Sequence, residues 1–367
     1  MTAKKVLVIT NMYPTNVHKS FGIFVKNQVE ALRNHGLAVD VAAIRNPRGG
    51  KLNVIKKYSG WFLQTLSTLL AKGKQYHVVH AHYVFPSGLL ALFFKQLFGT
   101  KMIVTAHGGD IDKMARKNAR IFNMTKKIMH KSDHVIAVGQ ELYDTITKEF
   151  NVPSDKVSII NMGVNRSVFK PVPKKEAKQT CGIQANITPI LFVGNILKQK
   201  GLLELAGAMK GVADEITNAH LYLIGAEKDE SFKKELVAQL TELGVESSVT
   251  FLGVKTQQDI AQWMNAADLF VLPSHIEGFG LVALEAMSCG TPVVGTAVGG
   301  LKYLLADGAG ELVAPKDTDA LKEGLIRILS SNSAKHDMIN KSIMRAEEND
   351  QERMIQKVIE VYFPTGG

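Results

Sequence analysis

The chain has 367 residues, of which 46% are hydrophobic and 21% charged, and it contains two cysteines. This length exceeds one compact core and predicts two domains of about 170 residues each. The composition excludes a disordered or disulfide-stapled protein, and no apolar run reaches the roughly 18 residues of a membrane-spanning helix. Since no signal-peptide pattern is present either, we expect a globular, cytoplasmic protein.

The net charge of +10 is unevenly distributed along the chain. Residues 1–180 hold 28 Lys and Arg against 10 Asp and Glu, whereas the remainder holds 16 against 24. A basic front half suits nucleic acid, an anionic membrane surface or a phosphorylated substrate. Because no nucleic-acid-binding signature is present, we expect an anionic membrane surface and no nucleic acid among the partners. The protein is then expected to lie peripherally on the inner face of the plasma membrane.

The first half of the chain alternates short apolar strands with helical patterns. Continuous apolar strands that alternate with helices predict a parallel, doubly wound α/β sheet. The Pro- and Lys-rich stretch that follows, residues 170–178, is predicted to be a linker. The predicted strands are 6–10, 38–43, 77–81, 102–105, 134–138 and 157–160, and the predicted helices are 21–34, 55–71, 87–97, 115–130 and 141–150.

The alternation resumes after the linker, which divides the chain into domains at 1–169 and 179–349. Two such sheets are expected to face a cleft at the carboxyl ends of their strands, where ligands bind. A final helix is predicted at 352–362. The strands of the second domain are predicted at 190–193, 221–224, 249–252, 269–272 and 292–294, and its helices at 202–212, 232–243 and 257–265.

Two carboxylates eight residues apart flank a glycine turn. Glu277 precedes Gly278-Phe279-Gly280, and Glu285 lies in the apolar helical run that follows. A helix start offers free N–H groups and the positive end of the helix dipole, which suit a phosphate. Eight residues is a little over two turns, so Glu285 can reach hydroxyls beyond the phosphate. The segment resembles the Glu-x7-Glu motif of family 4 retaining glycosyltransferases, with Pro-Ser before it and Ala-Met-x-x-Gly-x-Pro-Val after it.

A second segment places a lysine before a predicted helix. Lys200 precedes Gly201 after a strand and a loop, so its ammonium can lie over a diphosphate. The segment resembles the family's Gly-Arg-x-x-x-x-Lys-Gly, with Asn195 at the position of the arginine. Asparagine can donate a hydrogen bond to a phosphate oxygen but brings no charge.

Two features of the first domain also resemble this family. His107 follows a strand in Thr-Ala-His-Gly-Gly-Asp, similar to the family's His-Gly motif, whose histidine contacts the transferred sugar near its 6-position. Gly22 is similar to the N-terminal glycine loop that lets the backbone approach the donor phosphate. Asp110 and Asp112 mimic an Asp-x-Asp metal motif, but we expect them to cap a helix.

No metal site is expected from the histidines either. His80 and His82 share one face of a strand, but no carboxylate or cysteine nearby completes a tetrahedral set. For His82 we favour a hydrogen-bonding role on the side where the sugar acceptor binds.

A predicted helix at 113–131 carries a basic stripe within an arc of about 100°. Ala119, Ile121, Phe122 and Met129 are expected on the opposite side. This pattern favours an anionic lipid headgroup layer, and a solvated surface helix is the alternative. Residues 56–61, with two lysines, a tyrosine and a tryptophan, leave the same two interpretations open. The stripe consists of Lys113, Arg116, Lys117, Arg120, Lys127 and Lys131.

The resemblance covers both halves of the chain and implies a GT-B fold of two Rossmann-like domains. It implies an acceptor-side domain at 1–169, on which residues 350–367 pack back, and a nucleotide-sugar-binding domain at 179–349. The implied reaction is hexosyl transfer with retention from a nucleotide-diphosphate sugar, in the first place a UDP-sugar, without a metal or other cofactor. The implied catalytic residues are Glu277, Lys200 and His107, and the donor-binding residues are Gly22, Asn195, Val254, Gly280, Leu281, Val282 and Glu285.

The acceptor is less well defined by the sequence. Tyr13-Pro14 and residues 21–28 resemble bacterial enzymes that build surface polysaccharides or teichuronic-type polymers on lipid carriers. We therefore expect a lipid-linked or small-molecule acceptor. A GT-B nucleotide-sugar epimerase and a non-catalytic sugar- or lipid-binding scaffold remain alternatives.

Overall fold

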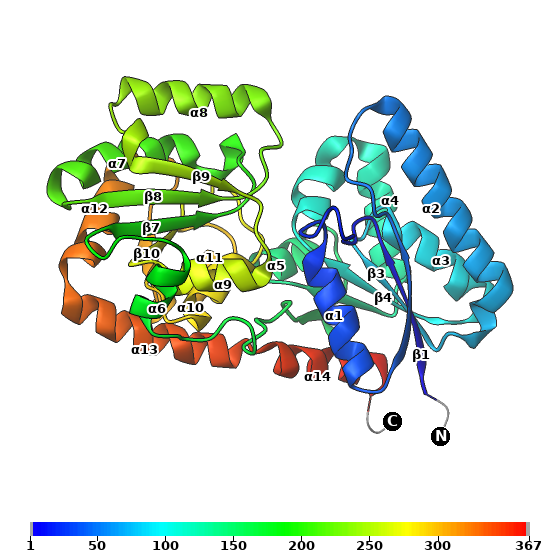
Figure 1. The fold of residues 1–367 in the computed structure, drawn as a ribbon. Coiled ribbons are helices and arrows are strands. Elements are labelled where there is room, and N and C mark those ends of the chain that lie inside the picture. Colours follow the sequence, from blue (N-terminus) through cyan, green and yellow to red (C-terminus); the bar gives the residue numbers. More distant parts are fainter. Residues whose placement is uncertain (1–2, 365–367) are drawn as a thin grey trace. The chain divides into compact units, whose positions relative to one another are not determined.

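The computed structural model describes residues 3–364, which form two compact units (Figure 1). Unit 1 comprises the described residues up to Met162 and those from Glu352 on, and unit 2 is Gly163–Gln351. Each unit contains one six-stranded parallel sheet with helices, so the predicted fold class of two doubly wound domains is confirmed. Within the described residues, no helix combines the length and apolar character needed to cross a membrane.

The sheet of unit 1 has the strand order β2-β1-β3-β4-β5-β6. Its register aligns the carboxyl ends of three strands, since Thr10 pairs with His82 and His82 with Thr105. The elements are β1 Lys5–Thr10, α1 Ile23–Asn34, β2 Ala38–Ala43, α2 Lys51–Lys72, β3 Val78–His82, α3 Ser87–Phe98, β4 Lys101–Ala106, α4 Ala119–Lys131, β5 His134–Ala137, α5 Gln140–Lys148, β6 Val157–Ile159 and α14 Gln351–Tyr362.

The sheet of unit 2 has the order β12-β11-β10-β7-β8-β9. Apart from Thr188 at the start of β7, its central strands β7 and β10 are buried and apolar, as a sheet covered on both faces requires. The elements are α6 Lys174–Thr180, β7 Thr188–Val193, α7 Leu202–Glu215, β8 Ala219–Ile224, α8 Glu230–Glu242, β9 Val249–Gly253, α9 Gln257–Ala266, β10 Leu269–Leu272, α10 Leu281–Ser288, β11 Val293–Thr296, α11 Leu301–Leu304, β12 Glu311–Val313, α12 Thr318–Ser330 and α13 Asn332–Glu348.

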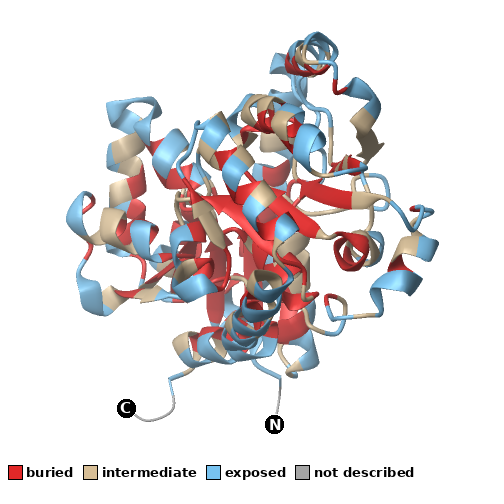
Figure 2. Ribbon diagram, turned by 90° about the vertical axis from the view of Figure 1, so that its left-hand side faces the viewer, coloured by how far each residue is buried: buried red, intermediate tan, exposed pale blue. Residues whose placement is uncertain are grey.

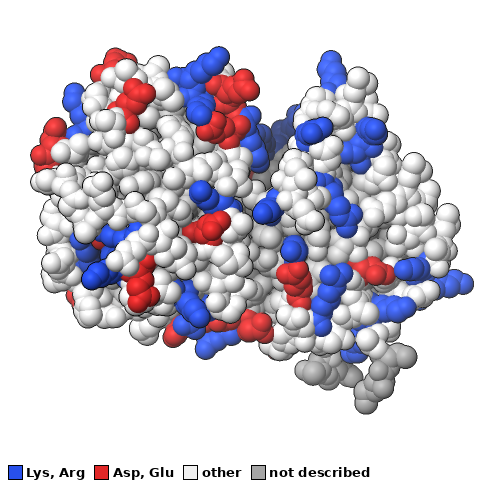
Figure 3. Space-filling model, viewed as in Figure 1, with Lys and Arg blue, Asp and Glu red and all other residues white. Residues whose placement is uncertain are grey.

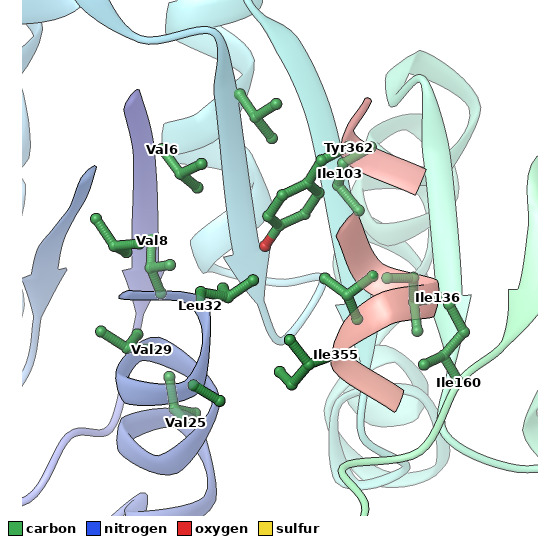
Figure 4. Close-up of a cluster of buried hydrophobic side chains, with 14 of the residues drawn as sticks. Val6, Val8, Val25, Val29, Leu32, Ile103, Ile136, Ile160, Ile355 and Tyr362 are labelled. Carbon is green, nitrogen blue, oxygen red and sulfur yellow. The ribbon is translucent and has the colours of Figure 1, made fainter. Parts of the chain in front are cut away.

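The core of unit 1 joins the two ends of the chain. Helix α14 lies beside α1 against the sheet, and the Tyr362 ring points among the strand side chains (Figure 4). Buried residues concentrate in the strands and on the inner faces of the helices (Figure 2). The buried cluster includes Val6, Val8, Val25, Val29, Leu32, Ile103, Ile136, Met354, Ile355, Val358 and Tyr362.

The stretch predicted as a linker contains part of a helix. Helix α6 begins directly after Pro173, whose backbone is extended, and its Ala177 packs in a small cluster with Ile183 and Ala266. Proline before a first helical turn is compatible with helix, because the first turn needs no N–H donors. The Pro-Lys composition therefore marks a helix start at this position.

The single helix predicted over residues 113–131 is wrong. Gly109–Met114 forms a π-helical turn and Ala115–Lys117 a short 3-10 turn, and α4 begins only at Ala119. Between them Asn118 is extended, and its side chain accepts a hydrogen bond from the N–H of Ile121 at 2.9 Å. Asparagine is among the strongest N-cap residues, so it starts a new helix here. The basic stripe is consequently split between separate elements.

Candidate functional site

Three loops of unit 2 converge at the carboxyl ends of β7, β10 and β11. The N–H of His275 donates to the carbonyl of Gln199 at 2.9 Å, and the N–H of Gly300 donates to that of Gly278 at 3.0 Å. Such close approach requires glycine. A Cβ on Gly201, whose φ is +69°, would lie 1.9 Å from the carbonyl oxygen of Pro273. The loops therefore form one packed edge of the sheet.

An ion pair lies at this edge. The ammonium of Lys200 is 2.7 Å from Oε2 of Glu277, and the hydroxyl of Ser274 donates to the same oxygen at 3.2 Å. The two charged side chains are 20% and 17% exposed, so the pair is largely shielded from water yet still reachable. The structure thus brings together two residues that the sequence analysis assigned to one site, although 77 positions separate them.

The start of α10 lies in the same loop region. Gly280 precedes the helix with φ +90° and provides no side-chain cap. Within residues 3–364, the backbone N–H groups of Gly280, Leu281 and Val282 have no hydrogen-bond acceptor. Leu281 and Val282 are only partly buried. The N–H groups of Leu281 and Val282 and the positive end of a helix dipole therefore remain available to an anion, and the N–H of Gly280, a buried residue, has no partner among the described residues.

Glu285 lies on α10 and has an unusual environment. The side chain is half-buried, and no described residue forms a hydrogen bond or ion pair with it. Burial raises the pKa of Glu285 to about 8, so the carboxyl is mostly protonated at pH 7 in the free protein. A carboxyl without partners is suited to accept hydrogen bonds from ligand hydroxyls.

Asn195 and Val254 extend this edge toward β8 and β9. Asn195 is half-buried in the loop after β7, and Val254 follows β9 with 52% exposure. The intervening position is Gly225, where a Cβ would lie 1.7 Å from the carbonyl oxygen of Gly194. The strand ends therefore form a continuous row, and Val254 offers an exposed apolar surface at one end of it.

One contact that supports these loops was not predicted from the sequence. His275 lies 2.9 Å from Oε1 of Glu204, which is in the first turn of α7. This contact links the loop that carries Glu277 to the helix that follows Lys200. In the sequence, His275 lies near Glu277 and Glu204 lies near Lys200, but this proximity does not predict that His275 and Glu204 pair.

In unit 1, Asp110 connects the loops after β3 and β4. Its buried carboxylate accepts hydrogen bonds from the N–H groups of Val84 at 2.7 Å and His107 at 3.0 Å. Burial raises the pKa of Asp110 to about 6. Asp112 is exposed, so the two carboxylates do not act as one pair. The expectation that both cap a helix is wrong for Asp110, which instead fixes the backbone that presents His107.

His107 belongs to a cluster of neutral histidines. Its Nε2 lies 3.1 Å from Nδ1 of His82, and burial lowers the pKa of both rings, that of His82 to about 3. His80 contacts the hydroxyl of Tyr362 at 2.5 Å and that of Thr105 at 2.7 Å. The predicted hydrogen bond between His82 and the sugar acceptor stays a prediction, and the connection from His80 to Tyr362 was not predicted.

Gly22 lies near this cluster. It precedes α1 with φ +74°, and a Cβ there would lie 2.6 Å from the carbonyl oxygen of Met12. In the first turn of the helix, the centre of the Phe24 ring lies 5.0 Å from that of the His107 ring. The structure thus brings Gly22 and His107 into one region of unit 1. Among the described residues, no group of three or more His, Cys, Asp or Glu side chains is arranged to hold a metal ion.

Comparison with protein families supports the assignment suggested by these motifs. Residues 173–345 match the model described as glycosyl transferases group 1, and residues 22–168 match that of glycosyltransferase family 4. Together the two models account for most of both units.

Three relatives illustrate the similarity. An uncharacterized glycosyltransferase of Methanocaldococcus jannaschii is 29% identical over 92% of this chain and 94% of its own. The D-inositol 3-phosphate glycosyltransferase of Actinosynnema mirum is 30% identical over 78% of this chain and 72% of its own. A putative teichuronic acid biosynthesis glycosyltransferase of Bacillus subtilis is 25% identical over 88% of each.

Solved structures share the fold. Sucrose-phosphate synthase from Thermosynechococcus elongatus superposes with a TM-score of 0.83 at 23% identity, covering 98% of each chain. HepE from Anabaena in complex with UDP superposes with a TM-score of 0.78 at 20% identity, covering 97% of this chain and 99% of its own. The chain therefore belongs to the group 1 and family 4 glycosyltransferases and is a glycosyltransferase of the GT-B type.

Proposed function

We propose that the protein is a retaining hexosyltransferase that uses a nucleotide-diphosphate sugar, a UDP-sugar in the first place. The acceptor is lipid-linked or a small molecule of cell-surface polysaccharide or glycolipid synthesis. The observation that carries this proposal is the shielded Lys200–Glu277 pair beside the three free N–H groups at the start of α10. A cation and N–H donors suit a diphosphate, and the adjacent carboxylate suits sugar hydroxyls.

Breaking the glycosidic bond places negative charge on the leaving diphosphate. Preorganised donors at that position stabilise the charge as it develops, without a metal. Lys200 has three N–H donors, so it can hold Glu277 and a phosphate oxygen at once. Asn195 and the N–H groups of Gly280, Leu281 and Val282 supply further hydrogen bonds. Glu277 binds the sugar hydroxyls and orients the ring.

Other residues are assigned to the remaining parts of the donor. Glu285 accepts hydrogen bonds from the ribose hydroxyls, and Val254 lies against the base. In unit 1, Gly22 lets the backbone approach the donor phosphate and His107 contacts the transferred sugar near its 6-position. The relatives support this choice of substrates, because HepE is known in complex with UDP and with UDP-glucose.

The relatives also support the choice of acceptor. One of them is a putative teichuronic acid biosynthesis glycosyltransferase, and another acts on an inositol phosphate, as its name says. The basic front half of the chain favours an acceptor presented at an anionic membrane surface, on the cytoplasmic side.

The decisive experiment is nucleotide release from a panel of nucleotide sugars, with and without candidate acceptors. We expect release of UDP that depends on an acceptor, and a product with the anomeric configuration of the donor. Conversion of the donor sugar in the absence of acceptor would favour an epimerase. Binding of the nucleotide sugar without turnover under any condition would favour a scaffold.

Activity is expected to survive treatment with EDTA. The proposed site neutralises the diphosphate with Lys200 and N–H groups, so removal of divalent cations leaves its electrostatic partners in place. Initial rates of UDP release are measured after EDTA dialysis and after addition of Mg²⁺ or Mn²⁺. A strict requirement for either ion would contradict the proposed mechanism.

Donor binding is expected to strengthen as the pH rises from 6 toward 8. The pKa of Glu285 is raised to about 8 in the free protein, and hydrogen bonds from ribose hydroxyls favour the ionised form, so binding releases a proton. Above the pKa of the free carboxyl the dependence disappears. Isothermal titration of a nucleotide sugar in buffers of different ionisation enthalpy measures the proton release. The Glu285→Gln variant should bind weakly and without this pH dependence; an unchanged profile in that variant would exclude the ribose role.

A further inference from the structure

Helix α2 leaves an apolar stripe uncovered. Its buried residues are Trp61, Thr65 and Leu69, which share one side at i, i+4 and i+8. The side next to these residues, centred about 110° around the helix from them, carries six large apolar residues that lie within an arc of about 100° at 100° per residue. They are 37% to 84% exposed, and no described part of the chain covers them. The stripe consists of Leu52, Ile55, Phe62, Leu63, Leu66 and Leu70.

The stripe is too regular to be scattered surface apolarity. It runs from Leu52 to Leu70, which corresponds to about 27 Å along the helix axis. Single exposed apolar residues are normal on a protein surface, whereas a continuous patch marks an interaction site. Helix α3, which packs on α2, adds the exposed side chains of Phe93 and Leu97 to the same part of unit 1. Something outside the described chain is therefore expected to cover this side.

The charges around the stripe identify what covers it. Residues 41–109 contain nine Lys and Arg but no Asp or Glu. Lys51, Lys56 and Lys57 lie in the N-terminal half of α2. Asp40 forms an ion pair with α2, but with Lys72 at the other end of the helix. The surface over α2, at the upper right in Figure 3, shows Lys and Arg but no Asp or Glu. An apolar stripe flanked by lysines matches a layer of anionic headgroups over acyl chains.

We infer that the α2 stripe docks the protein on an anionic lipid bilayer, with the helix axis in the plane of the membrane. A second copy paired through the same stripe would bring one basic surface without acidic residues against another, which disfavours a dimer. The buried side of α2 remains on the sheet, so the helix lies on the membrane and does not cross it. This inference deepens the membrane association proposed above and rests on it for the acceptor's location.

The structure changes the two surfaces suggested by the sequence: Lys56 of the first flanks the α2 stripe, and the second is divided between separate elements. In the cluster at 56–61, Trp61 is buried and donates to the carbonyl of Ala42, so the exposed apolar groups are aliphatic residues and Phe62. The basic stripe at 113–131 is split, and Arg116 is paired with Glu149 at 2.8 Å. The α2 stripe combines apolar and basic residues on one continuous helix.

The test is co-sedimentation of the full-length protein with vesicles. Vesicles of phosphatidylglycerol and phosphatidylcholine in equal parts are compared with phosphatidylcholine alone, at low salt and at 1 M salt. Screening shortens from about 10 Å at 0.1 M to about 3 Å at 1 M, so the lysine contribution should vanish while part of the apolar contribution remains. We expect strong binding to the anionic vesicles and weaker, salt-insensitive binding to the neutral ones.

Two variants separate the apolar contribution to vesicle binding from the contribution of the lysines. Leu63→Gln with Leu70→Gln removes apolar burial and should lower the partition coefficient at least tenfold on both vesicle types. Lys51→Gln with Lys56→Gln should lower it about fivefold per residue, on anionic vesicles at low salt only. Met344→Gln is the matched control, because Met344 on α13 is 63% exposed and Leu63 is 62% exposed. All substitutions are at exposed positions, and circular dichroism verifies that each variant is folded.

Two results would overturn the inference. One is unchanged vesicle binding by the leucine variant. The other is a wild-type dimer in sedimentation velocity that the leucine variant converts to monomer, which would make the stripe a contact between copies. Calorimetric binding of UDP is measured on the same samples. Normal UDP binding without vesicle binding would refute the α2 surface alone, whereas absence of UDP binding would count against the proposed donor site.

Discussion

Glu277→Gln and Lys200→Ala are each expected to lower kcat/KM for sugar transfer by about 100-fold or more, the scale for loss of one electrostatic partner of a transition state. Lys200 loses its charge beside the leaving diphosphate, and Glu277 loses the charge that holds the sugar hydroxyls. The two side chains are only 2.7 Å apart, so their effects should not be additive. The double variant should therefore lose less than the product of the two single losses.

Binding measurements separate the two roles. UDP lacks the sugar, so Lys200→Ala should weaken UDP binding while Glu277→Gln leaves it nearly unchanged. Lys198→Ala is the matched control. Lys198 lies in the same short turn as Lys200, but it is 66% exposed and pairs with Glu235, so its removal should leave the rate within a factor of about two. Full activity in a folded Lys200 or Glu277 variant would show that the donor site lies elsewhere.

Most of the fold could be predicted from local patterns in the sequence. Residues 38–43 and 269–272 coincide with β2 and β10, because short, largely apolar segments between helices specify strands of a parallel sheet. Strand β12 was missed, since three residues at a sheet edge are too few to show periodicity. Helix α13 was missed because its buried residues, Met338, Ser342 and Ala346, include only one large apolar side chain.

The candidate site was predictable where a single segment carries its chemistry. The spacing of Glu277 and Glu285 and the position of Lys200 are visible in the sequence, whereas the 2.7 Å contact between Lys200 and Glu277 depends on the packing of two loops. The role of Asp110 was not predictable, because its carboxylate accepts a hydrogen bond from the loop after β3, and the position of that loop is set by the fold. The split of the helix at 113–131 depends on Asn118, whose capping preference outweighed the helical periodicity around it.

Contacts between segments far apart in the chain could not be predicted from local sequence patterns. His80 and Tyr362 are 282 positions apart, yet their side chains form a hydrogen bond inside unit 1. Burial lowers the pKa of His80 and raises that of Tyr362, so both groups are neutral at pH 7 and the bond joins an imidazole to a phenol. This bond couples the last helix of the chain to the strand that carries His82, and through it to His107.

The same contact predicts how much α14 stabilises unit 1. Tyr362 is 1% exposed in the cluster shown in Figure 4, so Tyr362→Ala should destabilise unit 1 by about 3–5 kcal/mol through the cavity it leaves. Tyr362→Phe retains the ring but leaves a buried nitrogen of His80 without a partner, at a cost of about 1–3 kcal/mol. Lys357→Ala, an exposed position on the same helix, is the control and should change stability by less than about 0.5 kcal/mol.

Urea unfolding measures these differences, and the chain offers a reporter for each unit. Its two tryptophans are Trp61 in unit 1 and Trp263 in unit 2, so a Trp263→Phe background makes the fluorescence report unit 1 alone. The expected order of midpoints is wild type and Lys357→Ala highest, then Tyr362→Phe, then Tyr362→Ala. An unshifted midpoint in Tyr362→Ala would show that the Tyr362 side chain contributes nothing to the stability of unit 1. A shift in Tyr362→Ala with none in Tyr362→Phe would assign the stabilisation to the packing of the ring and remove His80 from the account.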